Sequence, residues 1–277
     1  MTISPPAPDL SPTADVLRRN NVTQLGDPTG RPIVFAHGFG CGQEAWKRVV
    51  PYFSSDHRVV LFDHVGSGGS DISEYERGKY DSLHGYASDL LEVLDALDLR
   101  DAVVVGHSVA SMMAVLAANR DASRIGALVL LGPSPRYVND DGYTGGFEQG
   151  DIDALLDTLD ANYLGWSREM APMIVGNLDR PELGEELTES FCSTDPAIAR
   201  QFAHVTFLSD NRADLFEITV PTLVLQSTDD IIAPRAVGEY VHRTIAGSSY
   251  RLLATTGHCA HLSGADEVAR EIRSFLL

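Results

Sequence analysis

Short apolar runs alternate with helical patterns along most of the sequence, and this alternation constrains the fold more than any other feature. The apolar runs, which we expect to be strands, cover residues 31–37, 58–64, 101–107, 126–132, 219–227 and 249–256. Helical periodicity falls at 44–53, 83–97, 109–119, 235–245 and 265–275. Continuous apolar strands are typical of sheets buried on both faces. The pattern therefore predicts an α/β fold with a mostly parallel, doubly wound sheet.

The alternation is interrupted between residues 135 and 214. This stretch holds helical patterns such as DIDALLDTLDANYLGW and DPAIARQFAHVTFL but no clear strand. Eighty residues are too many for a loop without structure of its own. We therefore predict a core formed by residues 1–134 and 215–277, with a helical cap over 135–214. Such an insertion would cover the strand ends, where ligands bind in open α/β sheets.

Charge, hydropathy and cysteine content narrow the possible partners and the compartment. The 277 residues include 21 basic and 39 acidic side chains, a net charge of −18. This balance argues against nucleic acid or an anionic membrane as a partner. No apolar segment reaches membrane-spanning length, and the leader MTISPPAPDLSPTADVL resembles a frayed end more than a secretory signal. The cysteines are too dispersed for a disulfide framework, which favours a reducing, cytoplasmic setting: Cys41, Cys192 and Cys259.

Ser108 is the candidate nucleophile. It lies in VVVGHSVAS, directly after an apolar strand and at the start of a helical pattern, which is the context of the G-x-S-x-G nucleophile elbow. Ala110 replaces the last glycine of that motif, but it adds only a methyl group. A serine in this position can also be a simple helix cap. The residues around it must decide between the two interpretations.

A base and an acid follow Ser108 in the chain order typical of this chemistry. His258 comes directly after a strand, and Asp230 follows the strand before it, so the order is Ser, Asp, His. Asp229 is the competing acid, but Asp230 has the favoured spacing to the following proline. His261 could pair with His258 as metal ligands; no further ligand pattern supports this, so we expect no metal.

Two glycine-rich segments follow strands. The segment His37-Gly38-Phe39-Gly40 suits a loop that supplies one oxyanion donor, while the second comes from the residue after the nucleophile. This assigns the main-chain N–H groups of Phe39 and Val109. The loop also resembles a phosphate-binding G-x-G-x-x-G, but Gln43 occupies the third glycine position, so we expect no nucleotide cofactor. The segment 65–71, VGSGGSD, predicts a tight connection.

Together these segments resemble the α/β-hydrolase superfamily, and within it the RsbQ-like group, with the plant strigolactone and karrikin receptors as more distant members. Further matching segments run through the whole chain, including AHGFGCGQEAW, FDHVGSGGSD, GPSPRYVND, GGFEQGDI, FCSTDPAIARQFA and GHCAHLS. The resemblance implies a helical cap over an apolar pocket beside the serine. It also implies which residues line that pocket: Phe39, Val109, Tyr137, Trp166, Phe202 and Ile231.

The sequence supports two functions of different classes. The first is a serine hydrolase that cleaves a small hydrophobic ester or lactone through an acyl-enzyme. The second, implied by the resemblance, is a receptor that binds and slowly hydrolyses a small apolar ligand and acts through a regulatory protein partner. A cofactor-free perhydrolase would use the same three residues, although nothing in the sequence points to peroxide. The sequence leaves the first two functions open.

Overall fold

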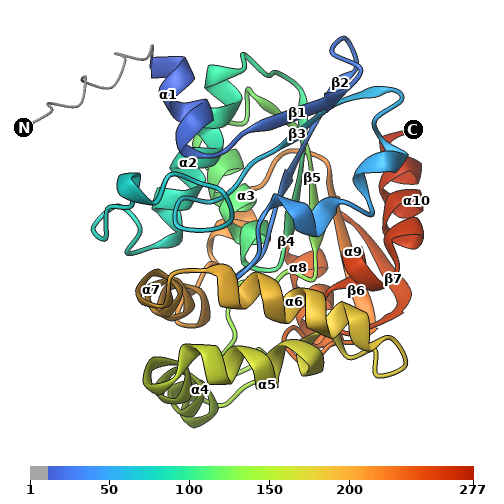
Figure 1. Cartoon of the computed structure of the whole chain (residues 1–277). Helices are drawn as coiled ribbons and strands as arrows, with labels where there is room; N and C mark the ends of the chain where they lie inside the picture. Colours follow the sequence, from blue (N-terminus) through green and yellow to red (C-terminus); the bar gives the residue numbers. More distant parts are fainter. Residues whose placement is uncertain (1–11) are drawn as a thin grey trace, which may run out of the picture.

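A seven-stranded sheet forms the centre of the protein (Figure 1). The computed structural model describes residues 12–277. The strand order is β1-β3-β2-β4-β5-β6-β7, and every neighbouring pair is parallel except β1 with β3. The strands are β1 (Thr23–Gly26), β2 (Arg31–Ala36), β3 (His57–Leu61), β4 (Ala102–His107), β5 (Ile125–Leu131), β6 (Thr222–Asp229) and β7 (Ser249–Thr256). The predicted α/β fold is confirmed.

Helices cover both faces of the sheet because successive strand residues point to opposite sides. On one face, Val34 of β2 packs in a core shared with α2 (Leu83–Ala96), α3 (Val109–Arg120) and α8 (Arg235–Thr244). On the other face, its neighbours Ile33 and Phe35 pack in a core shared with α10 (Ala265–Leu276) and the short α9 (Ala260–Ser263). The sheet is thus buried on both sides, which explains the continuous apolar runs.

Two local features differ from the sequence expectations. The helix expected over 44–53 is replaced by two short 3₁₀ helices, Gln43–Trp46 and Val50–Tyr52, because Pro51 lacks the N–H that a continuous helix requires. Within the expected frayed leader, α1 (Pro12–Arg19) is helical, and Arg19 pairs with Asp89 and Glu92 of α2. The rest of the leader, residues 1–11, lies outside the described residues.

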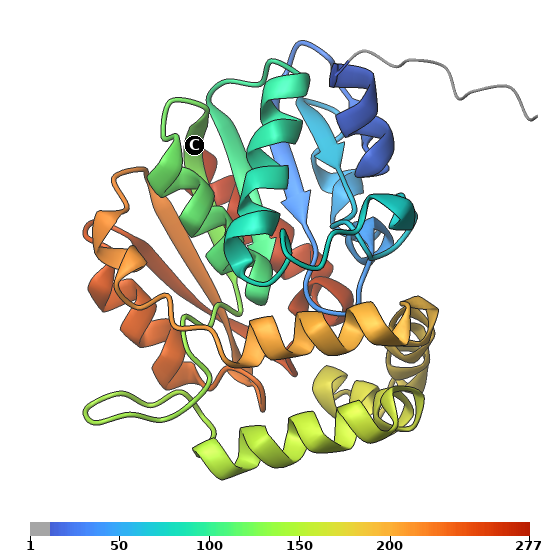
Figure 2. The same cartoon turned by 90° about the vertical axis from the view of Figure 1, so that its left-hand side faces the viewer.

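Four helices follow β5 before the chain returns to the sheet. They are α4 (Gln149–Ala161), α5 (Tyr163–Val175), α6 (Pro181–Ser193) and α7 (Pro196–Phe207), and they lie across one end of the sheet (Figures 1 and 2). Their apolar faces pack together with Phe39, Cys41 and Cys259. These three residues follow the carboxyl ends of β2 and β7, so the helices cover the sheet edge at which α/β proteins bind ligands. Over residues 12–277, no helix is long and apolar enough to cross a membrane.

Candidate active site

A strained turn between β4 and α3 presents Ser108. Its backbone angles, φ 56° and ψ −125°, are unusual for a residue other than glycine, and its N–H donates to the carbonyl of Leu131 on the neighbouring strand. The close approach of strand and helix falls on Gly106, where an added Cβ would lie 2.6 Å from the carbonyl oxygen of Ala110. The methyl group of Ala110 is itself fully buried in the core. The turn therefore accommodates alanine at this position.

Ser108, His258 and Asp230 form one continuous hydrogen-bonded chain. His258 Nε2 lies 2.8 Å from Ser108 Oγ, and His258 Nδ1 lies 2.8 Å from Asp230 Oδ2. All three residues are at most 6 % exposed. A carboxylate only accepts, so Nδ1 carries the proton and Nε2 is free to accept the serine proton. The competing carboxyl group of Asp229 is exposed and lies outside this chain. A nucleophile, a base and an orienting acid would require this arrangement.

Main-chain donors fix the Asp230 carboxylate. Its Oδ1 accepts the N–H groups of Ile232 and Ala233, at 2.8 and 3.0 Å, while Oδ2 faces His258. The two bonds turn the chain directly after Asp230. As a result, the side chain of Ile231 is 46 % exposed and Ile232 faces the interior.

The predicted oxyanion loop passes directly beside Ser108. An added Cβ on Gly38 would lie 3.3 Å from Ser108 Cβ. Two buried histidines hold this loop: His37 Nε2 accepts the N–H of His64, and His64 Nε2 donates to the carbonyl of His37. The assignment of Phe39 and Val109 as oxyanion donors remains a prediction, with Val109 at the first position of α3 and Phe39 following Gly38.

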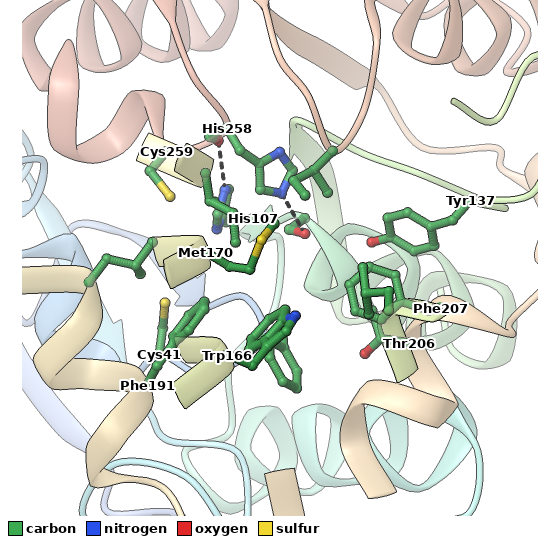
Figure 3. Close-up of a pocket in the computed structure, with 16 residues that line it drawn as sticks. Cys41, His107, Tyr137, Trp166, Met170, Phe191, Thr206, Phe207, His258 and Cys259 are labelled. Carbon is green, nitrogen blue, oxygen red and sulfur yellow. Dashed lines mark hydrogen bonds between the residues drawn. The ribbon is translucent and has the colours of Figure 1, made fainter. Parts of the chain in front are cut away.

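An apolar cavity opens beside the triad (Figure 3). The space open to the centres of water-sized molecules is small, about 40 Å³. Three of the predicted pocket residues line it, namely Phe39, Tyr137 and Trp166. The sequence reasoning missed the other walls, which are Cys41, His107, Leu155, Met170, Ile174, Leu187, Phe191, Thr206, Phe207, Ile232 and Cys259.

Two predicted pocket residues, Ile231 and Phe202, do not line this cavity. Ile231 points to solvent at the turn after Asp230, and its neighbour Ile232 lines the cavity instead. Phe202 is buried but stacks on Tyr86 of α2, with ring centroids 4.7 Å apart. Its ring also packs against the ring of Phe39, with centroids 5.5 Å apart, and does not line the cavity. The side chain of Val109 belongs to the sheet core and does not line the cavity either.

Burial controls the ionisation of the groups around the cavity. It raises the pKa of the Cys41 thiol to about 12 and that of Cys259 well above its ordinary value. Both are therefore protonated thiols near neutral pH and poor nucleophiles. Burial also raises the pKa of Tyr137 to about 12, opposed by the neighbouring Ser108 hydroxyl. In contrast, burial lowers the pKa of His107 well below the ordinary value, so this ring is neutral.

His261 lies next to the triad, but among the described residues it belongs to no group of side chains that could hold a metal ion. Its ring packs between Trp46 and His107, with centroids 4.9 and 4.2 Å away. Neither ring nitrogen has a hydrogen-bond partner among the described residues. Burial lowers its pKa to about 3. In the part of the chain that the structure covers, no three histidine, cysteine or acidic side chains are grouped to hold a metal ion.

The fold and this arrangement of side chains define a class of proteins. A family model described as "Alpha/beta hydrolase family" matches residues 33–271. The chain therefore belongs to the α/β-hydrolase family, as its motifs predicted.

Its relatives include both esterases and receptors. The chain is 36 % identical to "Strigolactone esterase D14" of Arabidopsis thaliana, over 95 % of this chain and 98 % of that protein. It is 37 % identical to "Karrikin insensitive 2 receptor IA" of Petunia hybrida, over 85 % and 86 %. Among solved structures, the hydrolase olei00960 from Oleispira antarctica superposes with a TM-score of 0.92 at 39 % identity, covering 95 % of this chain and 97 % of that one.

Proposed function

We propose that the protein is a serine hydrolase that cleaves a small hydrophobic ester or lactone through an acyl-enzyme. The observation that carries this proposal is the continuous chain from Ser108 through His258 to Asp230, with 2.8 Å at each step, beside an apolar cavity. Nucleophilic catalysis needs a serine whose proton has a nearby acceptor and a base whose tautomer is fixed. Both conditions are met by buried groups that are already in place.

The geometry supports a two-step reaction. Ser108 Oγ attacks the carbonyl carbon while its proton moves to His258 Nε2, and the ionised Asp230 stabilises the resulting imidazolium. The N–H groups of Phe39 and Val109 would hold the oxyanion, each worth roughly 3 to 4 kcal/mol at the transition state. His258 then returns the proton to the leaving alcohol. Water, deprotonated by the same histidine, cleaves the acyl-enzyme and frees the acid.

The cavity walls support a neutral, apolar substrate. The lining is dominated by aromatic and aliphatic side chains, and burial keeps Cys41 and Cys259 protonated and the His107 ring neutral. A charged acyl group would lose its hydration here without gaining a partner of opposite charge. The Tyr137 hydroxyl, beside Ser108, is the polar group best placed to orient an ester or lactone. The three free cysteines of the described chain support a reducing, cytoplasmic setting.

Steady-state hydrolysis by matched variants tests this proposal. Aryl acetates, aryl butyrates and small lactones are incubated with wild type and Ser108→Ala. Ser167→Ala is the control, since Ser167 is also buried, does not line the cavity and donates its hydroxyl to the carbonyl of Tyr163 within α5. We expect Ser108→Ala to lose at least about a thousandfold in kcat and Ser167→Ala to resemble wild type. Undiminished activity of Ser108→Ala would overturn the assignment.

A second function is favoured by the names of the relatives. They include receptors as well as esterases, at 36–37 % identity over most of the chain. A receptor with this site would retain its acyl group, change the position of the four helices α4–α7 and so alter its affinity for a regulatory protein. Slow turnover with ligand-dependent hydrogen exchange in α4–α7 would support this second function. Rapid turnover with unchanged exchange would favour the enzyme.

A further inference from the structure

The main chain of His258 is held on both sides by groups from other elements. Its N–H donates to the carbonyl of Ile174 at 2.8 Å, in the last turn of α5. Its carbonyl accepts Nε2–H of His107 at 3.0 Å, the bond drawn between these residues in Figure 3. The first bond comes from α5, a helix that covers the cavity, and the second from His107, the residue before Ser108. Together they fix the backbone that carries the imidazole.

Two side chains strengthen the support from α5 and α6. Asn177, in the turn between these helices, donates from Nδ2 to the carbonyls of Val175 and Thr256, at 2.6 and 3.1 Å. Arg180 donates from Nη2 to Asn177 Oδ1 and to the carbonyl of Ser263, both at 2.8 Å. Thr256 and Ser263 lie at the two ends of the segment that contains His258. We call Asn177 and Arg180, with the Ile174 carbonyl, the α5–α6 clamp.

The end of α5 also contacts the segment that contains His258 directly, through main-chain atoms of both segments. An added Cβ on Gly257 would lie only 1.8 Å from the carbonyl oxygen of Val175, and Gly257 has φ +82°. Gly176, also at positive φ, faces the same residue, with 3.2 Å between its own added Cβ and Gly257 Cα. No side chain separates the two segments at this point. A displacement of the α5 end is therefore passed directly to the residue before His258.

The same helix also forms part of the cavity wall. Trp166, Met170 and Ile174 of α5 all line the cavity. The space open to the centres of water-sized molecules is only about 40 Å³, so a bulky acyl group would press against these side chains. The element that a substrate would touch is thus the element that holds the His258 N–H.

From these contacts we infer that Asn177 and Arg180 are positioning residues for His258, which hold its imidazole at hydrogen-bond distance from Ser108 Oγ. This inference rests on the proposed function of the triad. Neither residue lines the cavity, so neither is expected to touch the substrate. Loss of the clamp should lower kcat while KM stays nearly unchanged, because the cavity walls remain and only the base is misplaced. Misplacement of a reacting group by about 1 Å can cost about a hundredfold in rate.

The chain offers a matched control at another contact between the covering helices and the core. Gln201 of α7 donates from Nε2 to the carbonyls of Arg77 and Tyr80, at 2.8 and 3.0 Å. Like Asn177, it is a partly buried amide that bonds two main-chain carbonyls. It differs in that its partners lie far in sequence from His258. Asn177→Asp and Gln201→Glu therefore make the same chemical change, from a donating amide to a carboxylate facing two carbonyls.

The experiment compares these variants by kinetics and by hydrogen exchange. We expect Asn177→Asp to lower kcat for an aryl ester at least about tenfold with KM within twofold, and Gln201→Glu to keep the wild-type kcat. Arg180→Lys, which retains a donor for the Ser263 carbonyl, should keep more activity than Arg180→Met. The His258 amide should exchange faster in Asn177→Asp only. Equal kcat values, or equal exchange of that amide, in Asn177→Asp and Gln201→Glu would overturn the inference.

Failure of the inference and failure of the proposed function give different results. If the Ser108 assignment is wrong, Ser108→Ala retains the hydrolysis while the exchange of the His258 amide still reports on the clamp. If only the clamp inference is wrong, wild type hydrolyses the ester, Ser108→Ala does not, and Asn177→Asp is indistinguishable from Gln201→Glu.

Discussion

Buried neutral histidines should make the folded protein sensitive to mild acid. Burial lowers the pKa of His64 and His107 well below the ordinary value of 6.5, and that of His261 to about 3. All three are at most 3 % exposed. Below pH 6.5 the unfolded chain binds a proton on each of them and the folded chain does not. Their folded-state pKa values are depressed, so the contribution to stability is complete above pH 6.5 and is lost as the pH falls.

The size of this effect follows from proton linkage. Each such histidine changes the free energy of unfolding by about 1.4 kcal/mol per pH unit below its unfolded pKa. Between pH 7 and pH 5 this amounts to about 2 kcal/mol per residue, or about 6 kcal/mol for the three. Domains are typically stable by only about 5 to 15 kcal/mol. The pKa of His37 is also lowered by burial, against the opposing charge of Asp63, so three is a lower bound on the number of such residues.

Urea unfolding between pH 7.5 and pH 5.5 measures the slope. His261→Phe removes one titrating ring from a site where neither nitrogen has a described partner. We therefore expect its stability at pH 7.5 to be maintained and its slope below pH 6.5 to fall by about 1.4 kcal/mol per pH unit. His84→Gln is the control, since this exposed residue is solvated in both states. The reasoning would be refuted if the free energy of unfolding of the wild type changed by less than about 1.4 kcal/mol per pH unit below pH 6.5, the value for one histidine. An unchanged slope in His261→Phe would refute it as well.

Two further predictions concern the site itself. Because Oδ1 of Asp230 accepts two main-chain N–H groups, the amide of Asp230→Asn must turn its NH₂ toward His258 Nδ1 and impose the wrong tautomer; kcat should fall about 10⁴-fold, and a loss below tenfold would contradict this. Iodoacetamide at pH 8 should label Cys192 in the folded protein, while Cys41 and Cys259 react only after unfolding, as their raised pKa values require. Rapid labelling of either cavity thiol, detected by peptide mass, would show that the cavity is open.

The central sheet could be predicted from the sequence because its strands carry their own signal. A strand buried on both faces is a continuous apolar run, and β4 and β5 are of this kind. The edge strand β1 has no such run, because TQLG is mostly exposed and pairs on one side only. It was therefore missed. A continuous helix was expected where the 3₁₀ segments near Pro51 occur, because the spacing of apolar residues does not depend on the missing N–H of a single proline.

The elements of the candidate site were easier to predict than the cavity around it. Ser108, Asp230 and His258 each follow a strand at the same sheet edge, so the topology alone predicts that they meet. The cavity walls depend instead on which face of each covering helix turns inward. The amphipathic pattern of α7 does not reveal that Phe202 packs on α2 while Thr206 and Phe207 face the cavity.

Contacts between distant segments were beyond the reach of the sequence reasoning. The bonds from Asn177 to Thr256 and from Arg180 to Ser263 join residues about eighty positions apart. Asparagine in a turn and arginine near a helix start are common, and neither carries a local pattern that indicates its partner. Only the placement of α5 and α6 against the segment after β7 reveals them.

Counting product molecules per protein, together with the intact protein mass, tests the central claim most directly. Purified protein and Ser108→Ala are incubated with an aryl ester, quenched in acid at early times and mapped by peptide mass. Our account predicts many products per wild-type molecule, a transient mass increase equal to the acyl group on the peptide that contains Ser108, and neither in the variant. Equal hydrolysis by Ser108→Ala, or an acyl group mapped to another residue, would contradict it.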